Sequence, residues 1–145
     1  PDFEKLAAWR HAHRLALSAY GLSKLLPPEE RFALADQIRR SAASVPANIA
    51  EGYSRCSDTE FSYFIRVALG SAAELQSLAL LARDLGYVEH DRLAGFWPQA
   101  AQTIRMIRGL HRRVQEDIEV IDAIISRLSL SFPLPFAAVR RRLLP

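Results

Sequence analysis

Residues 37–55 read QIRRSAASVPANIAEGYSR and form the best-patterned segment of the chain. One set of positions, spaced four and three residues apart, is apolar or small: Ile38, Ala42, Val45, Ile49, Gly52 and Cys56. This is the spacing of the seam through which one helix of a bundle packs on its neighbours. A second set, which we call the polar row, lies one position earlier: Gln37, Ser41, Ser44, Asn48, Glu51 and Arg55. The stretch is therefore expected to form a helix with its apolar seam toward a core.

Pro46 interrupts this pattern. A proline inside a helix lacks an N–H and crowds the carbonyl four residues earlier, here that of Ala42, at a cost of about 3 kcal/mol. The seam stays in phase across the proline, which favours a continuous, kinked helix over two shorter ones. Ser41, Ser44 and Asn48 lie within one turn. Their side chains, or water, are expected to satisfy the freed carbonyl, and the bend is expected to serve packing or assembly.

The polar row has two interpretations. It is either a regular solvated face or a half-buried row of hydrogen bonds between helices. In the second case Glu51 would pair with Arg55 four residues on, and Asn48 or Ser44 would meet Glu74 across the bundle. Buried polar atoms need partners, so such a row would define helix register more than it would add stability.

The segment before this stretch also has helical periodicity. Apolar residues recur on one broad side of residues 3–25, and Asp2 is the expected N-cap. The pair Pro27 and Pro28 ends this helix. Because proline is tolerated in a first helical turn, the next helix is expected to start near residue 28.

Two further helices follow. SDTE, residues 57–60, is a capping box that begins the third helix, and Gly86 suits the left-handed position that ends it. A fourth helix is expected within about residues 90–118, where Pro98 either kinks it or marks its true start. Beyond that the pattern weakens, so residues 118–128 either extend the helix or belong to a separate tail.

No segment shows the alternation or turn signals of a sheet. The sequence predicts an all-α protein, an antiparallel up-down-up-down four-helix bundle. We expect the bundle domain to span residues 1–118 and a C-terminal extension to span residues 119–145, which is either poorly ordered or dependent on a partner.

Composition narrows the functional classes. The chain has 145 residues and one cysteine, Cys56, which excludes an internal disulfide. Apolar runs are only a few residues long, against the roughly 20 that cross a bilayer, and no segment resembles a signal peptide. We therefore expect a cytoplasmic protein without a membrane partner. The first residue is not methionine, so the numbering is expected to start inside the natural chain.

Three segments resemble a known family in order and spacing. They are FEKLAAWRHAHRLALSAY, QIRRSAASVPANIAEGYSR and EFSYFIRVALGSAAELQSLALLARDLGY, within residues 3–115. These segments are similar to the bacterial family of the 23S rRNA intervening sequence protein, also called S23. The resemblance implies a four-helix bundle that assembles into a ring-shaped homopentamer. Related accessory proteins of diversity-generating retroelements bind nucleic acid and a reverse transcriptase.

The family motif places a set of structural or assembly positions on this chain. They are Gln37, Arg39, Arg40, Ser44, Pro46, Asn48, Glu51, Gly52, Arg55, Gly70, Ser71 and Glu74. Residues 118–145 lie outside the resemblance, and Pro98 is not part of the motif.

Catalytic and metal-binding patterns are weak. Glu-x-x-His, which supplies ligands in di-iron bundles, does not occur in the sequence. His11 and His13 point to different sides of a helix, and His90 and His111 lack an obvious second ligand. We expect no metal, no cofactor, no small-molecule substrate and no enzymatic activity. An enzyme would require Glu51, Asn48 and Glu74 to converge in a cleft.

The arginines are the remaining indication of a function, namely binding of nucleic acid. The net charge is +3, and Lys5 and Lys24 are the only lysines. The candidate contacts to RNA or DNA are Arg10 and Arg14 on the first helix and Arg105, Arg108, Arg112 and Arg113 on the fourth. Repeated around a ring, they would create a strong field for phosphate; the alternative is an ordinary solvated face. Aromatic residues do not interleave with these arginines, so any binding is expected to be independent of sequence.

The leading hypothesis is a non-enzymatic, self-assembling scaffold or adaptor. The alternative is a nucleic-acid-binding accessory protein with arginine-rich faces on a ring-shaped oligomer and, in addition, a protein partner.

Overall fold

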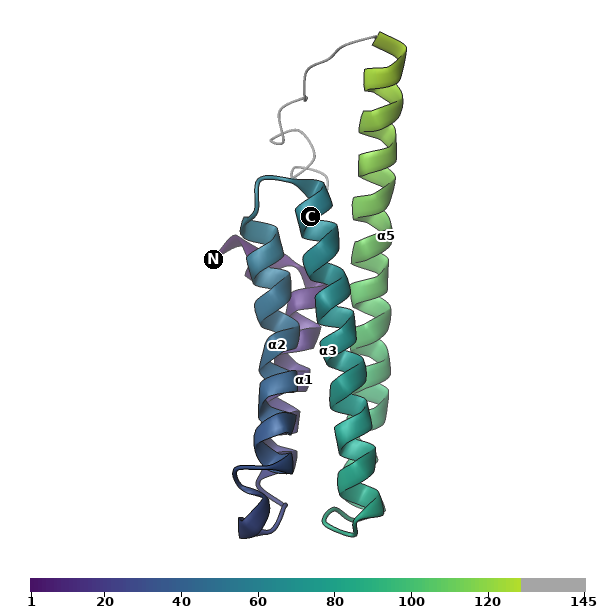
Figure 1. Cartoon of the computed structure of the whole chain (residues 1–145). Helices are drawn as coiled ribbons and strands as arrows, with labels where there is room; N and C mark the ends of the chain where they lie inside the picture. The colour runs from purple at the N-terminus through teal and green to yellow at the C-terminus, as the bar shows by residue number, and fades with distance from the viewer. Residues whose placement is uncertain (129–145) are drawn as a thin grey trace.

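Four long helices lie side by side in the computed structural model, which describes residues 1–128 (Figure 1). They are α1 (Ala7–Ser23), α2 (Leu34–Ser54), α3 (Asp58–Asp84) and α5 (Phe96–Leu128). Contacts join α1 to α2, α2 to α3, α3 to α5 and α5 to α1, so each helix packs on two neighbours. Consecutive long helices run in opposite directions (Figure 1). The predicted all-α, up-down-up-down four-helix bundle is confirmed.

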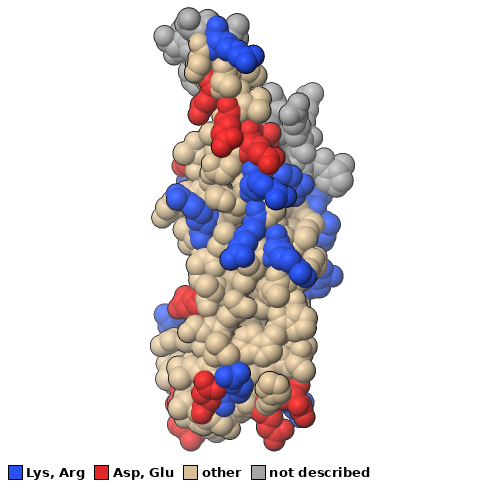
Figure 2. Space-filling model, turned by 90° about the vertical axis from the view of Figure 1, so that its right-hand side faces the viewer, with Lys and Arg blue, Asp and Glu red and all other residues tan. Residues whose placement is uncertain are grey.

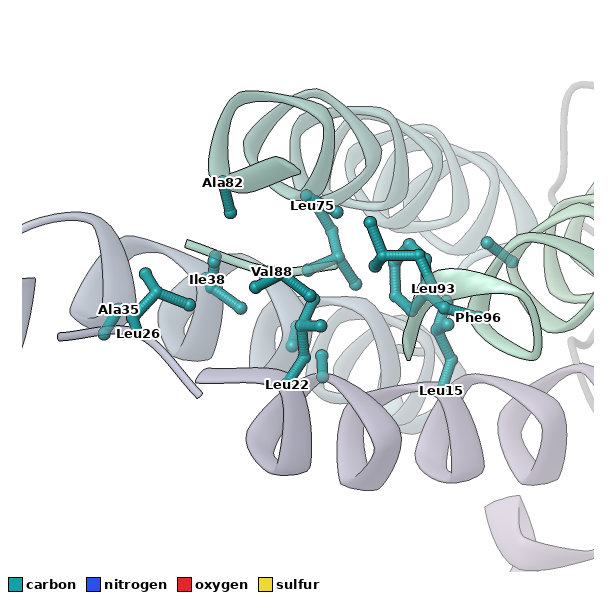
Figure 3. Packing of buried hydrophobic residues seen from close by; sticks show 14 of the residues in the cluster. Leu15, Leu22, Leu26, Ala35, Ile38, Leu75, Ala82, Val88, Leu93 and Phe96 are labelled. Carbon is teal, nitrogen blue, oxygen red and sulfur yellow. The ribbon is translucent and has the colours of Figure 1, made fainter. Parts of the chain in front are cut away.

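The predicted apolar seams form the core. On α2, Ile38, Ala42, Val45 and Ile49 are completely buried, whereas Cys56, the last member of the predicted row, is exposed. One part of the core joins Leu15 and Leu22 of α1 to the other helices and to the α3–α5 connection (Figure 3). A second part, toward the other end of the bundle, joins Leu6 and the small Ala8 and Ala12 of α1 to large side chains of the other three long helices: Val45, Ile49, Phe61, Ile65, Ile107, Leu110 and Val114.

The ends of α3 follow the predicted chemistry. Ser57 is the N-cap, and its hydroxyl accepts a hydrogen bond of 3.4 Å from the N–H of Glu60. Gly86 has a φ of +75°, and its N–H donates to the carbonyl of Arg83. The N–H of Tyr87 donates to the carbonyl of Ala82, which completes the glycine-terminated helix end. The short helix α4 (His90–Leu93) lies in the connection that follows.

The first helix begins later than predicted. Asp2 is not its N-cap, because Asp2–Lys5 forms a 3₁₀ helix and Leu6, with extended backbone, precedes α1. Asp2 instead accepts a hydrogen bond of 3.0 Å from Lys5. The guanidinium of Arg10 donates to the carbonyls of Glu4 and Lys5, at 3.0 and 2.7 Å, and so fastens the N-terminal turn to α1.

The second helix also begins later than predicted. Pro28–Glu30 forms a separate 3₁₀ turn, and α2 starts at Leu34 rather than near residue 28. The carboxylate of Glu30 explains the new start, because it accepts a hydrogen bond of 3.0 Å from the N–H of Leu34 and satisfies one of the free donors of the first turn. Tyr87 donates a second hydrogen bond to this carboxylate, at 3.2 Å.

Helix α5 decides between the alternatives left open for Pro98 and for residues 118–128. Pro98 lies in the first turn of α5 and marks its true start. The helix then continues to Leu128, ten residues beyond the predicted end at 118, so residues 119–128 are helical. Ile118, Ile121 and Ile125 are half-buried and keep the apolar seam in phase. In Figure 1 this end of α5 projects past the other helices. The remainder of the predicted extension, residues 129–145, lies outside the described residues.

Within residues 1–128, α3 alone has the length and composition of a membrane span. Its most apolar face, which includes Phe61, Ile65, Ala72 and Leu75, is buried inside the bundle. A core helix of a soluble bundle passes the same test, so the pattern is weak evidence for a membrane segment.

Candidate functional site

The centre of the polar row contains one half-buried hydrogen bond between α2 and α3, supported by further hydrogen bonds within α2. The hydroxyls of Ser44 on α2 and Ser71 on α3 are 2.8 Å apart. The amide of Asn48 donates to the hydroxyl of Ser44 at 2.9 Å and to its carbonyl at 2.8 Å. Ser41 is buried and donates to the carbonyl of Ile38 at 3.2 Å. The prediction of hydrogen bonds between helices is therefore confirmed at Ser44, whereas Ser41 and Asn48 bond within α2.

The partner across the bundle differs from the prediction. Ser71, not Glu74, meets Ser44, and Glu74 is exposed. The reason is geometric, because a small serine fits the close approach of the two helices while a long carboxylate reaches solvent. Glu51 forms the predicted ion pair with Arg55. Asn48, Glu51 and Glu74 therefore do not converge in one cleft.

The remaining charged motif positions are on the surface of α2. Arg40 and Arg39 both pair with the carboxylate of Asp36, at 2.7 and 3.4 Å. Arg39 also donates to the carbonyl of Arg31 at 2.8 Å and so ties the segment before α2 to the helix. Gln37 is exposed and marks the solvated end of the polar row.

Gly52 marks the closest approach of α2 and α3. A Cβ atom added at this position would lie 2.6 Å from Cβ of Phe64 and 2.9 Å from Cδ2 of Phe61. Both distances are below van der Waals contact, so only glycine fits without moving a helix. The second glycine of the motif, Gly70, has no atom within 4 Å of an added Cβ. The two motif glycines therefore have different roles.

Pro46 lies inside a continuous α2, which confirms the preference for one helix over two. The predicted partners of the freed Ala42 carbonyl bond elsewhere: Ser41 donates to Ile38, and Asn48 donates to Ser44. The expected side-chain rescue of this carbonyl is thus wrong. The serine and asparagine instead reinforce the helix on either side of the proline.

The Pro46 ring lines a groove between α1 and α2 that we call the apolar groove, with a volume of about 410 Å³. Its walls are aromatic and apolar side chains of α1 and the N-terminal turn and small side chains of α2: Phe3, Trp9, His13, Ala16, Leu17, Tyr20, Ala43, Pro46, Ala47 and Ala50. Phe3, Trp9 and His13 form a continuous series of ring contacts. Leu17 and Tyr20 are 61% and 43% exposed.

The predicted arginines do not form a single surface. Arg105, Arg108 and Arg112 share the outer side of α5, whereas Arg113 is turned by about 100° from Arg112. Arg10 holds the N-terminal turn instead of facing outward freely. Figure 2 shows basic side chains across the middle of the face that includes α5, with acidic side chains nearer its C-terminal end. Glu116 lies 3.9 Å from Arg112, at the boundary of the two groups.

A polar contact between α3 and α5 was not predicted. The hydroxyl of Ser62 lies 3.0 Å from Nε2 of His111 and accepts a hydrogen bond of 2.5 Å from the amide of Gln115. Burial, and then the positive charge of Arg66, lower the pKa of His111 below its usual 6.5. On α1, burial and the nearby Arg14 and Arg10 likewise lower the pKa of His11.

Two aromatic residues of α3, Tyr63 and Phe64, carry no signal in the sequence pattern but lie beside arginines in the structure. Tyr63 is 54% exposed, and the guanidinium carbon of Arg66 lies 6.0 Å from the centre of its ring. Arg55 lies 5.1 Å from the ring centre of Phe64. These contacts alternate aromatic side chains with Arg55 and Arg66, which are not among the arginines predicted to contact nucleic acid. Among residues 1–128 no group of three or more His, Cys, Asp or Glu side chains is placed to hold a metal ion.

Within residues 1–128 these features define a four-helix bundle with polar contacts between α2 and α3 and between α3 and α5, an apolar groove and an arginine-bearing face on α5. A family model described as 23S rRNA-intervening sequence protein matches residues 4–109, and the chain belongs to this family. A similar fold occurs in the crystal structure of a protein of unknown function from the S23 ribosomal protein family of Bacteroides thetaiotaomicron VPI-5482. The TM-score is 0.67 at 22% identity, covering 72% of this chain and 98% of the other. No curated protein matches the chain.

Proposed function

We propose that this protein is a non-enzymatic, cytoplasmic scaffold or adaptor whose copies associate through the apolar groove. The observation that supports the proposal is the exposure of apolar side chains along the groove, above all Leu17 at 61% and Tyr20 at 43%. Contiguous exposed apolar surface on a soluble protein marks an interaction site more often than isolated apolar residues do.

The shape of the groove suits a helix or an apolar edge from a second copy. Ala43, Ala47 and Ala50 recur at spacings of four and three on the outer side of α2, next to Pro46. Their small side chains leave room between the bulky side chains of α1, into which larger side chains of another copy fit. The resemblance to the family implies a homopentamer, and the groove is the surface that we assign to that assembly.

Paired substitutions test this proposal. Leu17→Lys places a charge in the groove, while Leu81→Lys, at a residue 47% exposed on α3, places the same charge outside the residues that line the groove. Both side chains are exposed in the single chain, so both variants are expected to fold. Light scattering after size exclusion should show a smaller species for Leu17→Lys only. An unchanged assembly in Leu17→Lys would place the interface elsewhere.

A second candidate function is binding of nucleic acid by the face that includes α5. The specific observation is that Arg105, Arg108 and Arg112 are exposed on one side of α5, with Arg66 of α3 close enough to act on His111. Repetition of this face in an assembly would multiply its charge, and counterion release would make the affinity depend on salt. Titration of labelled RNA and DNA at low and moderate salt tests it; no binding at low salt would end it.

A further inference from the structure

The structure brings aromatic rings and arginines together in a second groove, which we call the Tyr63 groove. It has a volume of about 430 Å³ and is lined by Arg55, Thr59, Glu60, Tyr63, Phe64 and Arg66. The Tyr63 and Phe64 rings pack edge to face, with centres 5.4 Å apart. Tyr63 presents more than half of its surface to solvent. An exposed ring held by a neighbouring ring and an arginine is suited to stacking with a planar ligand.

The contact between Ser62 and His111 places this groove relative to the arginines of α5. The two helices are antiparallel, and Ser62 and His111 are directly opposed. Arg66 lies about one turn beyond Ser62, and Arg108 lies about one turn before His111, so both are displaced in the same direction along the bundle. Arg66 and Arg108 are therefore at the same level, and the Tyr63 groove opens beside the basic face of α5.

The two ends of the Tyr63 groove differ in charge. At the end near α2, Arg55 is paired with Glu51, and Glu60 adds a further negative charge. At the end near α5, Arg66 faces Tyr63 and is followed by the exposed Arg108 on the neighbouring helix. An anionic backbone is therefore attracted toward α5 and not toward α2.

We propose that the Tyr63 groove binds an unpaired base of a single-stranded nucleic acid, which stacks on the Tyr63 ring while the adjoining phosphates contact Arg66 and Arg108. This inference rests on the second candidate function and specifies its substrate class. A double helix hides the faces of its bases, so it can use the arginines but not the ring. Every base has a face that stacks, so RNA and DNA strands share the chemistry that this groove recognises.

The experiment is a fluorescence anisotropy titration of the full chain with labelled oligouridylate, oligothymidylate and a DNA duplex of the same length. At about 50 mM salt, both single strands should bind more tightly than the duplex. Tyr63→Ala should weaken single-strand binding about tenfold or more and leave duplex binding unchanged, because stacking is lost. Tyr63→Phe should retain the affinity. The relative affinities of the two single strands identify which of them is the preferred ligand.

Two controls separate the ring from general effects. Phe32 is 84% exposed and also lies beneath an arginine, Arg31, at 5.2 Å, but it does not line the Tyr63 groove. Phe32→Ala should therefore leave every affinity unchanged. Arg66→Gln should weaken binding of all three oligonucleotides and reduce the slope of affinity against salt by about one.

The outcomes distinguish this inference from the function on which it rests. Equal binding of single strands and duplex, with no effect of Tyr63→Ala, overturns the stacking site and leaves nucleic-acid binding intact. Absence of binding by all three oligonucleotides at low salt overturns both.

Discussion

Gly52→Ala is the substitution whose effect the structure defines most sharply. The new Cβ would lie 2.6 Å from Cβ of Phe64, 2.9 Å from Cδ2 of Phe61 and 3.4 Å from the carbonyl oxygen of Phe61. Carbon atoms pack favourably at about 3.5–4.0 Å, so the shortest contact is about 1 Å too close. Because Cβ of Phe64 is fixed to the backbone, no change of rotamer relieves this contact. The α2 and α3 backbones must move apart.

Two opposing effects determine how much Gly52→Ala changes the free energy of unfolding. Overpacking of a well-packed core costs typically about 1–3 kcal/mol, and a clash between two backbone-fixed atoms belongs at the upper end. Replacing glycine by alanine inside a helix returns about 1 kcal/mol through helix propensity. The free energy of unfolding should therefore fall by about 2 kcal/mol.

Urea unfolding followed by circular dichroism measures this change, with Gly70→Ala as the matched control. Gly70 lies inside α3 with nothing within 4 Å of an added Cβ, so the control should be stabilised by about 0.5–1 kcal/mol. The urea midpoint should shift in opposite directions for the two variants with an unchanged slope. A Gly52→Ala protein as stable as the parent would refute the close approach of the helices.

Three further predictions concern the proline, a histidine and a serine pair. Pro46→Ala should alter the oligomer, seen by light scattering, more than the helix content, seen by circular dichroism; an unchanged oligomer counts against a role of the proline in assembly. Because the pKa of His111 is lowered in the folded state, the unfolded chain binds more protons, so the stability should be fully present above the ordinary pKa of 6.5 and should decline as the pH falls below it. His111→Gln should flatten this decline in urea titrations, and an equal slope would contradict the assignment. Ser71→Ala should lower the free energy of unfolding by about 1 kcal/mol, and a double-mutant cycle with Ser44→Ala should reveal coupling; purely additive effects would argue against their hydrogen bond.

Most of the fold was predictable because it depends on local periodicity and on end signals. The seam of Ile38, Ala42, Val45 and Ile49 is buried as expected, and Ser57 and Gly86 mark the ends of α3. Patterns of this kind act within a few turns of one helix and are therefore visible in the sequence. The start of α2 was harder to predict from the sequence. The first turn of the helix is capped by Glu30, a residue that was expected to lie inside the same helix.

The candidate sites were less predictable because they join residues far apart in the chain. A partner for Ser44 or Asn48 across the bundle was one of two interpretations of the polar row, and the choice of Ser71 over Glu74 depends on how closely two helices approach. The position of Tyr63 beside the arginines of α5 depends on the register of two antiparallel helices. The spacing of residues within one helix contains no information about how closely two helices approach or about their register. Ile118, Ile121 and Ile125 recur at helical spacings of three and four, and they are the signal for the longer α5 that the sequence left open as an alternative.

The mass of the intact protein in solution tests the central claim, self-assembly through the apolar groove, most directly. Sedimentation equilibrium of the full 16.3 kDa chain at micromolar concentration gives this mass without reference to shape. Assembly through the groove should give the mass of a homopentamer, reduced in Leu17→Lys and unchanged in Leu81→Lys. A single species with the mass of the monomer would contradict it.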